Sequence, residues 1–289
     1  MENTLLKSLC CPKCKADIKK EQTNWYCFNC NFKYKDENDI PILVNLENLP
    51  RHLQGQIRYF NKESKSLVKY ELSEWQKNYI GRFCKTFPLI KEKLIIDCGV
   101  GSGYMTIELA KLGANVIATD LTLQNLINLK KTAKELGLEN KIMPVCCDAQ
   151  SLSIKKGIAD YFVSNAVLEH LPEDQKAVEE IERVCKDSAG CLITVPLKFK
   201  FVNPLFWAPL YIADRNIGHL RRYDEKKLKE RFKNWRLSKT LYTGHFKKGV
   251  KIIINMIVKI FDENQIELED KQKENKRWGA SNIICFFKK

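Results

Sequence analysis

Two hydrophobic periods alternate along the middle of the chain. Short apolar runs such as 94–98 and 115–119 are typical of buried strands. Between them, apolar residues within 105–112 recur every three or four positions, which is the period of a helix packed on one side. Strands that alternate with helices predict an α/β fold built on a parallel sheet.

The first of these strands ends on an acid and continues into a turn with three glycines. The spacing is Asp-x-Gly-x-Gly-x-Gly (Asp97, Gly99, Gly101, Gly103). Glycine lets the backbone approach a ligand closely, so this strand, turn and helix start form a cradle for an adenosyl cofactor. A dinucleotide fingerprint would need a glycine or alanine where Tyr104 or Thr106 stands, and a phosphate loop would need Gly-Lys-Ser/Thr. Both sites are excluded.

The glycine turn resembles motif I of the class I S-adenosylmethionine-dependent methyltransferases. The second strand ends on Asp120, 23 residues after Asp97. An acid at that place hydrogen-bonds ribose hydroxyls in α/β nucleotide folds. Asp148 follows a third apolar run at 145–147. In methyltransferases the acid there faces the adenine amino group.

The resemblance extends over about 94–196, through a fourth strand and loop at 161–172 and a fifth strand at 190–196. It implies a Rossmann-like, seven-stranded, mostly parallel sheet flanked by helices, with 280–287 as a last, antiparallel strand. It also implies S-adenosylmethionine as the cofactor. The cofactor-binding residues that it indicates are Asp97, Gly99, Gly101, Gly103, Asp120, Leu121, Asp148, Ala149 and Asn165.

Four cysteines near the amino terminus have the spacing C-x2-C-x12-C-x2-C (Cys11, Cys14, Cys27, Cys30). Thiolates on two tight knuckles can surround zinc, and such a closed site contributes folding energy rather than catalysis. We therefore predict a structural Zn2+, with 15–26 as a hairpin arm and without Cys10, because the Cys-Pro-x-Cys knuckle begins at Cys11. The segment resembles small zinc-ribbon proteins, some of which activate methyltransferases. It resembles more loosely the ribbon of bacterial large-subunit rRNA guanine methyltransferases.

A helical connector is expected between the ribbon and the first strand. Apolar residues stand at helical spacing in 57–60 and 67–87, and Tyr59 or Tyr79 is a candidate for a lid over the cofactor. The predicted organisation is a zinc-ribbon module (1–46), a helical connector and cofactor lid (47–92) and a class I methyltransferase domain (93–289) with an acceptor-side insertion at about 197–223.

Composition limits the setting of the protein. The formal net charge is +14, and 214–251 holds 13 Lys or Arg against 4 Asp or Glu. Such a strip can attract phosphate, nucleic acid or an anionic membrane, or it can be a solvated lysine-rich surface. Twelve cysteines, several in predicted strands, fit reduced thiols in the cytoplasm. We expect no transmembrane segment and no secretory leader, and therefore a cytoplasmic protein; peripheral membrane contact stays open.

Two histidines are candidates for chemistry. Methyl transfer needs in-line geometry first, and a base only where the acceptor is protonated. His219 stands in Gly-His-Leu-Arg-Arg-Tyr, which resembles a segment of small-molecule and glycan methyltransferases. His219 is therefore a candidate for a base or an acceptor ligand, with a structural role in the loop as the alternative. His170, in Glu-His-Leu-Pro, is a second candidate base, with capping and packing of its loop as the alternative. His52 and His245 lack such context.

Two downstream segments are strongly apolar. The stretch 198–213 leaves the fifth strand where a lid over an acceptor would begin. It predicts an aromatic lid over a flat, apolar or lipid-linked acceptor, and such a lid could enter a membrane surface. The alternative is a core helix or an oligomer contact. The stretch 250–261 is apolar nearly all round, which predicts a helix buried against the sheet rather than an anchor.

These patterns favour an enzyme that methylates a small-molecule, lipid-linked or glycan acceptor, and an oxygen is the expected site of methylation. The alternative is an rRNA or tRNA base methyltransferase that grips RNA with the ribbon and the basic strip. The loop after the fourth strand reads Ser-Asn-Ala-Val and lacks the Asn/Asp-Pro-Pro-Tyr/Phe signature of enzymes that methylate exocyclic base nitrogens. A degenerate, non-catalytic binder is disfavoured because the glycine turn and its acids are intact.

Overall fold

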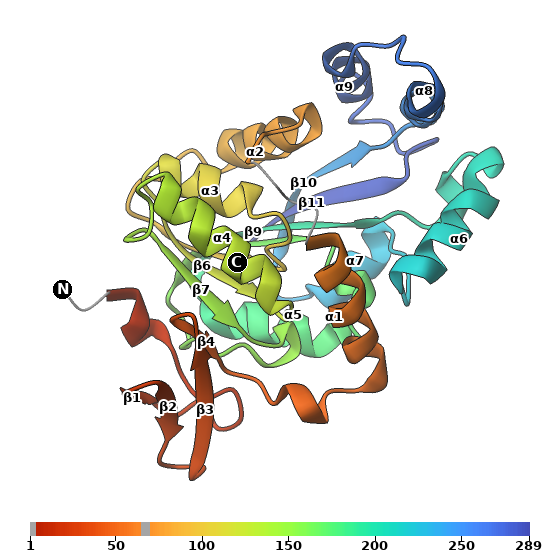
Figure 1. Cartoon of the computed structure of the whole chain (residues 1–289). Helices are drawn as coiled ribbons and strands as arrows, with labels where there is room; N and C mark the ends of the chain where they lie inside the picture. Colours follow the sequence, from red (N-terminus) through yellow and green to blue (C-terminus); the bar gives the residue numbers. More distant parts are fainter. Residues whose placement is uncertain (1–3, 65–69) are drawn as a thin grey trace.

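The computed structural model describes residues 4–64 and 70–289, and one continuous sheet runs through it (Figure 1). Seven strands form its centre in the order β7-β6-β5-β8-β9-β11-β10. The first five of these are parallel to one another, and β11 runs antiparallel to both of its neighbours. The seven-stranded, mostly parallel sheet and the antiparallel last strand are thereby confirmed. The bounds are β5 (Leu94–Cys98), β6 (Asn115–Asp120), β7 (Ile142–Cys146), β8 (Ala159–Asn165), β9 (Cys185–Pro196), β10 (Arg236–Thr243) and β11 (Asn282–Lys288).

Helices cover both faces of this sheet. Successive residues of a strand point to opposite faces, so Ile95 packs in one apolar cluster with α2, α3 and α4. Ile96 packs in a second cluster with α5 and α7. Both side chains are fully buried. The bounds are α2 (Glu74–Thr86), α3 (Tyr104–Lys111), α4 (Leu123–Glu135), α5 (Asp174–Val184) and α7 (Glu225–Arg231).

The amino-terminal strands extend the sheet at its β7 edge. Four short strands form an antiparallel meander, which includes the predicted hairpin arm. The last of them lies parallel to β7, where Ile42 pairs with Cys146 and the Leu43 amide donates to the Cys146 carbonyl at 2.8 Å. The ribbon is thus joined to the central sheet by backbone pairing. The bounds are β1 (Lys19–Glu21), β2 (Asn24–Cys27), β3 (Phe32–Glu37) and β4 (Ile40–Ile42).

The connector forms two helices, α1 (Arg51–Ser64) and α2. Helix α1 lies over α4, to which it is tied where the Asn128 side chain donates to the Ser64 carbonyl at 3.0 Å. The predicted helical position Leu67 and the first three residues of the chain lie outside the described residues.

The segment after β9 forms α6 (Trp207–Ile217), which lies away from the β1–β4 ribbon in Figure 1. Pro209 falls in the first turn of α6, where proline costs no internal hydrogen bond.

The expectation that 250–261 is buried against the sheet is wrong. These residues belong to α8 (Phe246–Ile257) and the turn after it, and α8 contains no buried residue. Helix α8 packs against α9 (Glu263–Lys271), a hairpin partner that stands off the sheet in Figure 1. An all-round apolar pattern predicted burial but could not identify the covering surface.

Candidate active site

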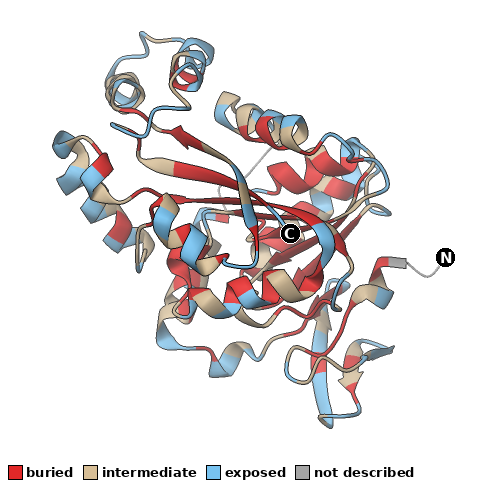
Figure 2. Cartoon of the chain, turned by 180° about the vertical axis from the view of Figure 1, so that it is seen from behind, coloured by how far each residue is buried: buried red, intermediate tan, exposed pale blue. Residues whose placement is uncertain are grey.

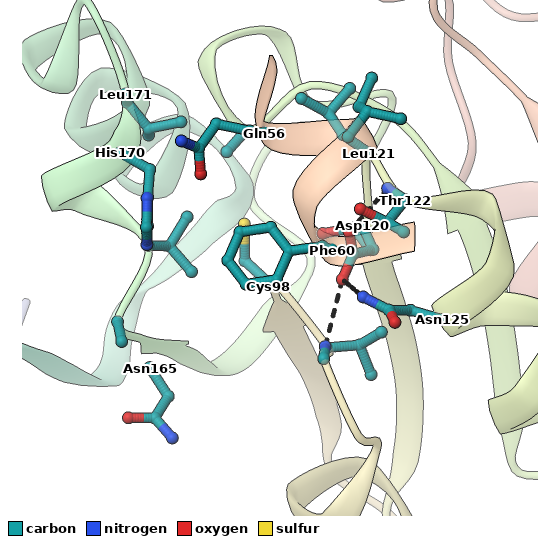
Figure 3. Close-up of a pocket in the computed structure, with 18 of the residues that line it drawn as sticks. Gln56, Phe60, Cys98, Asp120, Leu121, Thr122, Asn125, Asn165, His170 and Leu171 are labelled. Carbon is teal, nitrogen blue, oxygen red and sulfur yellow. Dashed lines mark hydrogen bonds between the residues drawn. The ribbon is translucent and has the colours of Figure 1, made fainter. Parts of the chain in front are cut away.

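A pocket of about 410 Å³ opens at the carboxyl ends of the parallel strands. Its walls include the end of β5 and the glycine turn after it, the ends of β6 and β8, and helix α1 (Figure 3). Ile217 at the end of α6 lines it as well. Parallel α/β sheets bind ligands at this edge, and the volume suits a small molecule. The lining is mostly apolar, with few polar groups that could orient a ligand.

The glycines of the turn are required for two different reasons. Gly99 has φ +76°, and a Cβ there would stand 2.3 Å from Cγ2 of Val167, so the loop after β8 leaves no room for a side chain. Gly101 has φ +51°, and a Cβ there would meet no protein atom within 4 Å. That open space lies in the pocket wall, where a bound molecule can reach the backbone.

Asp120 holds the glycine turn against β6. Its Oδ2 accepts hydrogen bonds from the Gly101 amide and from Asn125 Nδ2, both at 3.1 Å, and its Oδ1 accepts from the Thr122 amide at 2.7 Å (Figure 3). Burial raises the pKa of this carboxyl, and the three donors oppose that rise. Asp120 also lines the pocket, so a ligand hydroxyl could approach its carboxylate.

Not every predicted cofactor residue lies on the pocket wall. Gly99, Gly101, Asp120, Leu121, Ala149 and Asn165 do line it. Asp97 lies beneath the turn, where Thr106 Oγ1 donates to Asp97 Oδ2 at 2.6 Å, and burial raises its pKa to about 7. Gly103 begins α3 with φ +79°. Asp148 caps the turn Ala149–Ser151 by accepting from the Gln150 amide at 2.8 Å.

Asn165 ends β8 and is fixed by two side chains. Its Nδ2 donates to the Tyr104 hydroxyl, and its Oδ1 accepts from the Thr194 hydroxyl. Ala166 follows with φ +56°, an uncommon conformation for a residue with a side chain. Such local strain is often found at ligand sites, and here it directs Val167 into the pocket wall.

Helix α1 lines one side of the pocket, and neither candidate lid tyrosine, Tyr59 or Tyr79, is among the lining residues. Leu53, Gln56, Ile57 and Phe60 line the pocket at the i, i+3, i+4 and i+7 positions of one helix face. Tyr59 is outside that face, and Tyr79 is buried in the cluster of α2, α3 and α4. The other aromatic residues of the wall are Trp75 and Tyr104. Phe60 and Trp75 were not predicted as lining residues, because the sequence pattern does not determine which face of each helix points toward the pocket.

The two candidate histidines meet at one end of the pocket. The His170 and His219 rings lie 4.7 Å apart, and Phe60 stacks edge-on against His170 at 5.6 Å. His219 Nδ1 lies 2.7 Å from Asp214 Oδ1, and Arg222 Nε donates to the other carboxylate oxygen at 2.6 Å. Burial lowers the pKa of His170 to about 3 and also lowers the pKa of His219. Both rings are therefore neutral near pH 7.

Glu169 stands behind His219 as a fully buried carboxyl group. Within the described part of the chain neither of its oxygens has a hydrogen-bond partner, Oε1 lies 4.0 Å from His219 Nε2, and burial raises its pKa to about 8. Donor atoms of Glu169, His170 and His219 all lie within 4.8 Å of one another, so they form a polar group that could contact an acceptor or a cation. His52 Nε2 lies 3.0 Å from the His170 carbonyl oxygen, and His245 Nδ1 lies 2.7 Å from Asp270 Oδ1.

Residues 96–193 match the protein family described as Methyltransferase domain. The match begins inside β5 and ends inside β9, so it contains the glycine turn, Asp120, Asp148 and Asn165. The chain contains a class I methyltransferase domain.

Relatives of this methyltransferase domain match only part of the chain. The chain is 30% identical over 121 residues to 2-methyl-6-phytyl-1,4-hydroquinone methyltransferase 1 of Oryza sativa, and this alignment covers 42% of this chain and 34% of the relative. It is 30% identical over 92 residues to the ubiquinone biosynthesis O-methyltransferase of Colwellia psychrerythraea, which covers 32% of this chain and 37% of the relative. The chain thus spans about a third of the length of the curated relatives it matches.

The fold of the methyltransferase domain is similar to that of geranyl diphosphate C-methyltransferase from Streptomyces coelicolor. The TM-score is 0.60 at 10% identity, and the similarity covers 83% of this chain and 98% of that one. At this identity the likeness supports the fold and says nothing of the substrate.

The four cysteines of the two knuckles gather beside the methyltransferase domain. The sulfur atoms of Cys11 and Cys30 lie 3.9 Å apart, those of Cys14 and Cys27 lie 3.5 Å apart, and all four lie within 4.8 Å. Four thiolates at about 2.3 Å around a tetrahedral zinc would be about 3.8 Å from one another. The cluster therefore has the donor set and spacing that zinc requires, and Cys10 stays outside it.

The first knuckle also contacts the loop that follows Ala149. Ser151 Oγ donates to the Pro12 carbonyl at 2.8 Å, and Lys15 Nζ donates to the Leu152 carbonyl at 3.2 Å. Lys15 also pairs with Glu180 of α5 at 2.8 Å. The ribbon thus contacts the segment that forms one wall of the pocket. The sequence did not predict this contact, because the two segments are far apart along the chain.

Proposed function

We propose that this chain transfers the methyl group of S-adenosylmethionine to a small, apolar or lipid-linked acceptor, with a hydroxyl oxygen as the methylated atom. The observation that carries the proposal is a single pocket that joins the glycine turn to the His170–His219 pair. A cofactor at the glycine turn would have its acceptor at the histidine end of the same pocket.

The pocket residues suit S-adenosylmethionine in a definite orientation. The Asp120 carboxylate, which lines the pocket, would bind a ribose hydroxyl, and the segment from Cys147 to Ala149 would flank the adenine. Asn165, held by Tyr104 and Thr194, would face the methionyl end. When bound, the cofactor supplies an electrophilic methyl group. Protein side chains then contribute mainly by holding donor and acceptor in line.

His219 is the residue that we assign to the acceptor. Asp214 accepts the hydrogen bond of Nδ1–H, which fixes the ring and leaves Nε2 unprotonated. A neutral imidazole held in this way can accept the hydroxyl proton, and His170 beside it adds a second neutral ring that orients the acceptor. The lowered pKa values of both rings support this role.

Lining and relatives both favour an apolar acceptor over a glycan. Apolar side chains of α1 and the end of α6, including Leu53, Phe60 and Ile217, border the histidine end. The names of the two relatives mention a phytyl hydroquinone and ubiquinone biosynthesis. An aromatic or isoprenoid alcohol is therefore the first acceptor class to test.

We also propose that the four-cysteine cluster binds one structural Zn2+. A closed set of four thiolates leaves no position for a substrate, so its contribution would be to the folding of the ribbon and to its contact with the pocket loop.

RNA methylation has less support. The ribbon occupies one edge of the sheet, and the basic strip that includes β10 occupies the other, so the two do not form one continuous RNA-binding surface. The test is transfer of a labelled methyl group to phenolic and isoprenoid acceptors, compared with transfer to RNA. Labelling of RNA alone would overturn the assignment.

A further inference from the structure

Exposed large apolar side chains are concentrated in one part of the described chain. Eleven of the nineteen that it contains fall between 205 and 260. In α8 and the turn after it, Met256 and Ile257 are each 82% exposed. Around the start of α6, Leu205 is 75% exposed. The other exposed large apolar side chains of these two segments are Trp207, Tyr211, Ile212, Ile252, Ile253, Val258 and Ile260.

These residues belong to one surface, which we call the α6–α8 surface. The rings of Phe206 and Phe246, at the starts of the two segments, lie 5.3 Å apart. A Cβ at Gly249 would stand 2.8 Å from the Phe206 ring, so this ring packs directly on the α8 backbone. Figures 1 and 2 show α6 and α8 on the same side of the molecule, with exposed and half-buried residues along both.

Helix α8 is amphipathic, and its polar side is occupied. Lys248 pairs with Glu267 and Lys251 with Glu269, so the lysine side of the helix faces α9. Ile252 and Met256 as well as Ile253 and Ile257 are spaced four apart on the side that remains. No helix in the described part of the chain is long and apolar enough to cross a membrane. An apolar face of this length suits a helix that lies in the plane of a membrane surface.

Cations without ion pairs border this apolar face. Arg215, Lys247 and Lys259 are exposed, and no ion pair within 4 Å joins any of them to an acid in the described residues, although Lys247 is close enough to Glu269 to help lower the pKa of that carboxyl. Tyr211 and Trp207 lie in the same segment, and such side chains prefer the boundary between lipid and water. Apolar side chains bordered by unpaired cations are complementary to an anionic lipid surface rather than to a neutral one.

The α6–α8 surface adjoins the pocket at two points. Helix α6 begins in this surface at Trp207 and ends at Ile217, which lines the pocket. Trp75 lines the pocket on one side and, on the other, a groove shared with Ile252 and Met256 of α8. An acceptor dissolved in a membrane under this surface would be close to the histidine end.

We propose that the α6–α8 surface docks on an anionic phospholipid membrane, with α8 lying in the plane of the interface. The docking itself is independent of the reaction. Delivery of a lipid-soluble acceptor from that membrane rests on the proposed function. A second copy of the chain is the competing occupant of the same face.

Vesicle binding of the full chain tests the proposal. The probes are phosphatidylcholine vesicles with and without phosphatidylglycerol, measured by co-sedimentation. The chain is expected to bind the mixed vesicles and to be released by salt, because screening weakens the contact with Lys247 and Lys259. The double variant Met256→Glu and Ile257→Glu is expected to lower binding at least tenfold. The variant Lys247→Gln with Lys259→Gln should weaken binding to the mixed vesicles only.

The matched control is Leu89→Glu with Leu112→Glu, which places the same charges on exposed leucines elsewhere. It should bind vesicles as the parent does. Absence of vesicle binding by the parent, or an equal loss in the control, would overturn the proposal. So would a dimer by sedimentation equilibrium that Met256→Glu with Ile257→Glu dissociates.

Affinity for S-adenosylmethionine, measured on the same samples, separates this proposal from the proposed function. Vesicle binding without cofactor binding would overturn only the proposed function, and the reverse result would overturn only the docking.

Discussion

His219 donates from Nδ1 to Asp214 Oδ1 at 2.7 Å, although the two residues are only five apart along the chain. Gly218 makes this possible by ending α6 with φ +82°, so that the His219 amide also donates to the Asp214 carbonyl at 2.7 Å. The histidine is therefore held at backbone and ring by one aspartate. A residue so fixed at the end of a pocket is suited to positioned proton transfer.

Substitution of His219 tests this role. His219→Ala is expected to lower kcat roughly a hundredfold or more, because a positioned base contributes about 10²–10⁴ in rate. Affinity for the cofactor should stay within about twofold by calorimetry, since the ring lies at the acceptor end. His52→Gln serves as the control, because His52 Nε2 lies 3.0 Å from the His170 backbone carbonyl and His52 is not among the residues that line the pocket. Equal kcat in parent and His219→Ala would exclude the assignment.

The two pocket glycines should respond differently to a methyl group. Gly99→Ala is expected to destabilise the fold by about 1–3 kcal/mol, because its Cβ would overlap Val167 at a positive φ. Gly101→Ala should cost about 1 kcal/mol from φ alone, and its main effect should be weaker cofactor binding. Urea unfolding and calorimetric titration of both variants separate the effects. Equal cofactor affinity in Gly101→Ala and the parent would contradict the placement of the cofactor.

Disruption of the four-cysteine cluster should weaken cofactor binding in the pocket. Cys27→Ser is expected to remove zinc and to weaken cofactor binding about tenfold, because Pro12 and Lys15 of the first knuckle hold Ser151 and Leu152. Metal analysis and calorimetry on the same sample provide the check. Cys84→Ser, outside the cluster, should change neither value. A metal-free Cys27→Ser protein with unchanged cofactor affinity would show that the ribbon and the pocket are not coupled.

Burial of Asp97 predicts a pH-dependent stability. Its pKa is raised to about 7, so between about pH 4 and pH 7 the folded state holds a proton that the unfolded state has released. The stability from this group is full at low pH and falls as pH rises through that range, by at most about 4 kcal/mol. Urea unfolding at about pH 5 and about pH 8 should show a smaller decrease for Asp97→Asn than for the parent. Identical decreases would contradict a raised pKa.

The sequence predicted those parts of the fold whose physics is local. The alternation of Ile95 and Ile96 marks a strand buried on both sides, and the spacing of Gly99 and Gly101 marks a close backbone approach. Both patterns are complete within a few residues. Asp120 and Asp148 could be found for the same reason, because Asp120 ends β6 and Asp148 lies two residues after the end of β7.

Contacts between distant segments could not be predicted in this way. Phe60 reaches the pocket only because α1 presents that face to the carboxyl ends of the strands, and one helix does not specify its partner. The same uncertainty produced the wrong prediction for α8, whose apolar residues are exposed. Glu169 was visible as part of Glu-His, but its lack of partners depends on the surrounding fold.

The most direct measurement of the central claim is a calorimetric titration of S-adenosylmethionine into the parent and into Asp120→Asn. This change keeps an acceptor for the Thr122 amide but removes the carboxylate. We predict one bound cofactor per parent chain, at least tenfold weaker binding in a folded Asp120→Asn, and no heat from a nicotinamide dinucleotide. Absence of binding by the parent, or equal affinity in the folded variant, would contradict the account.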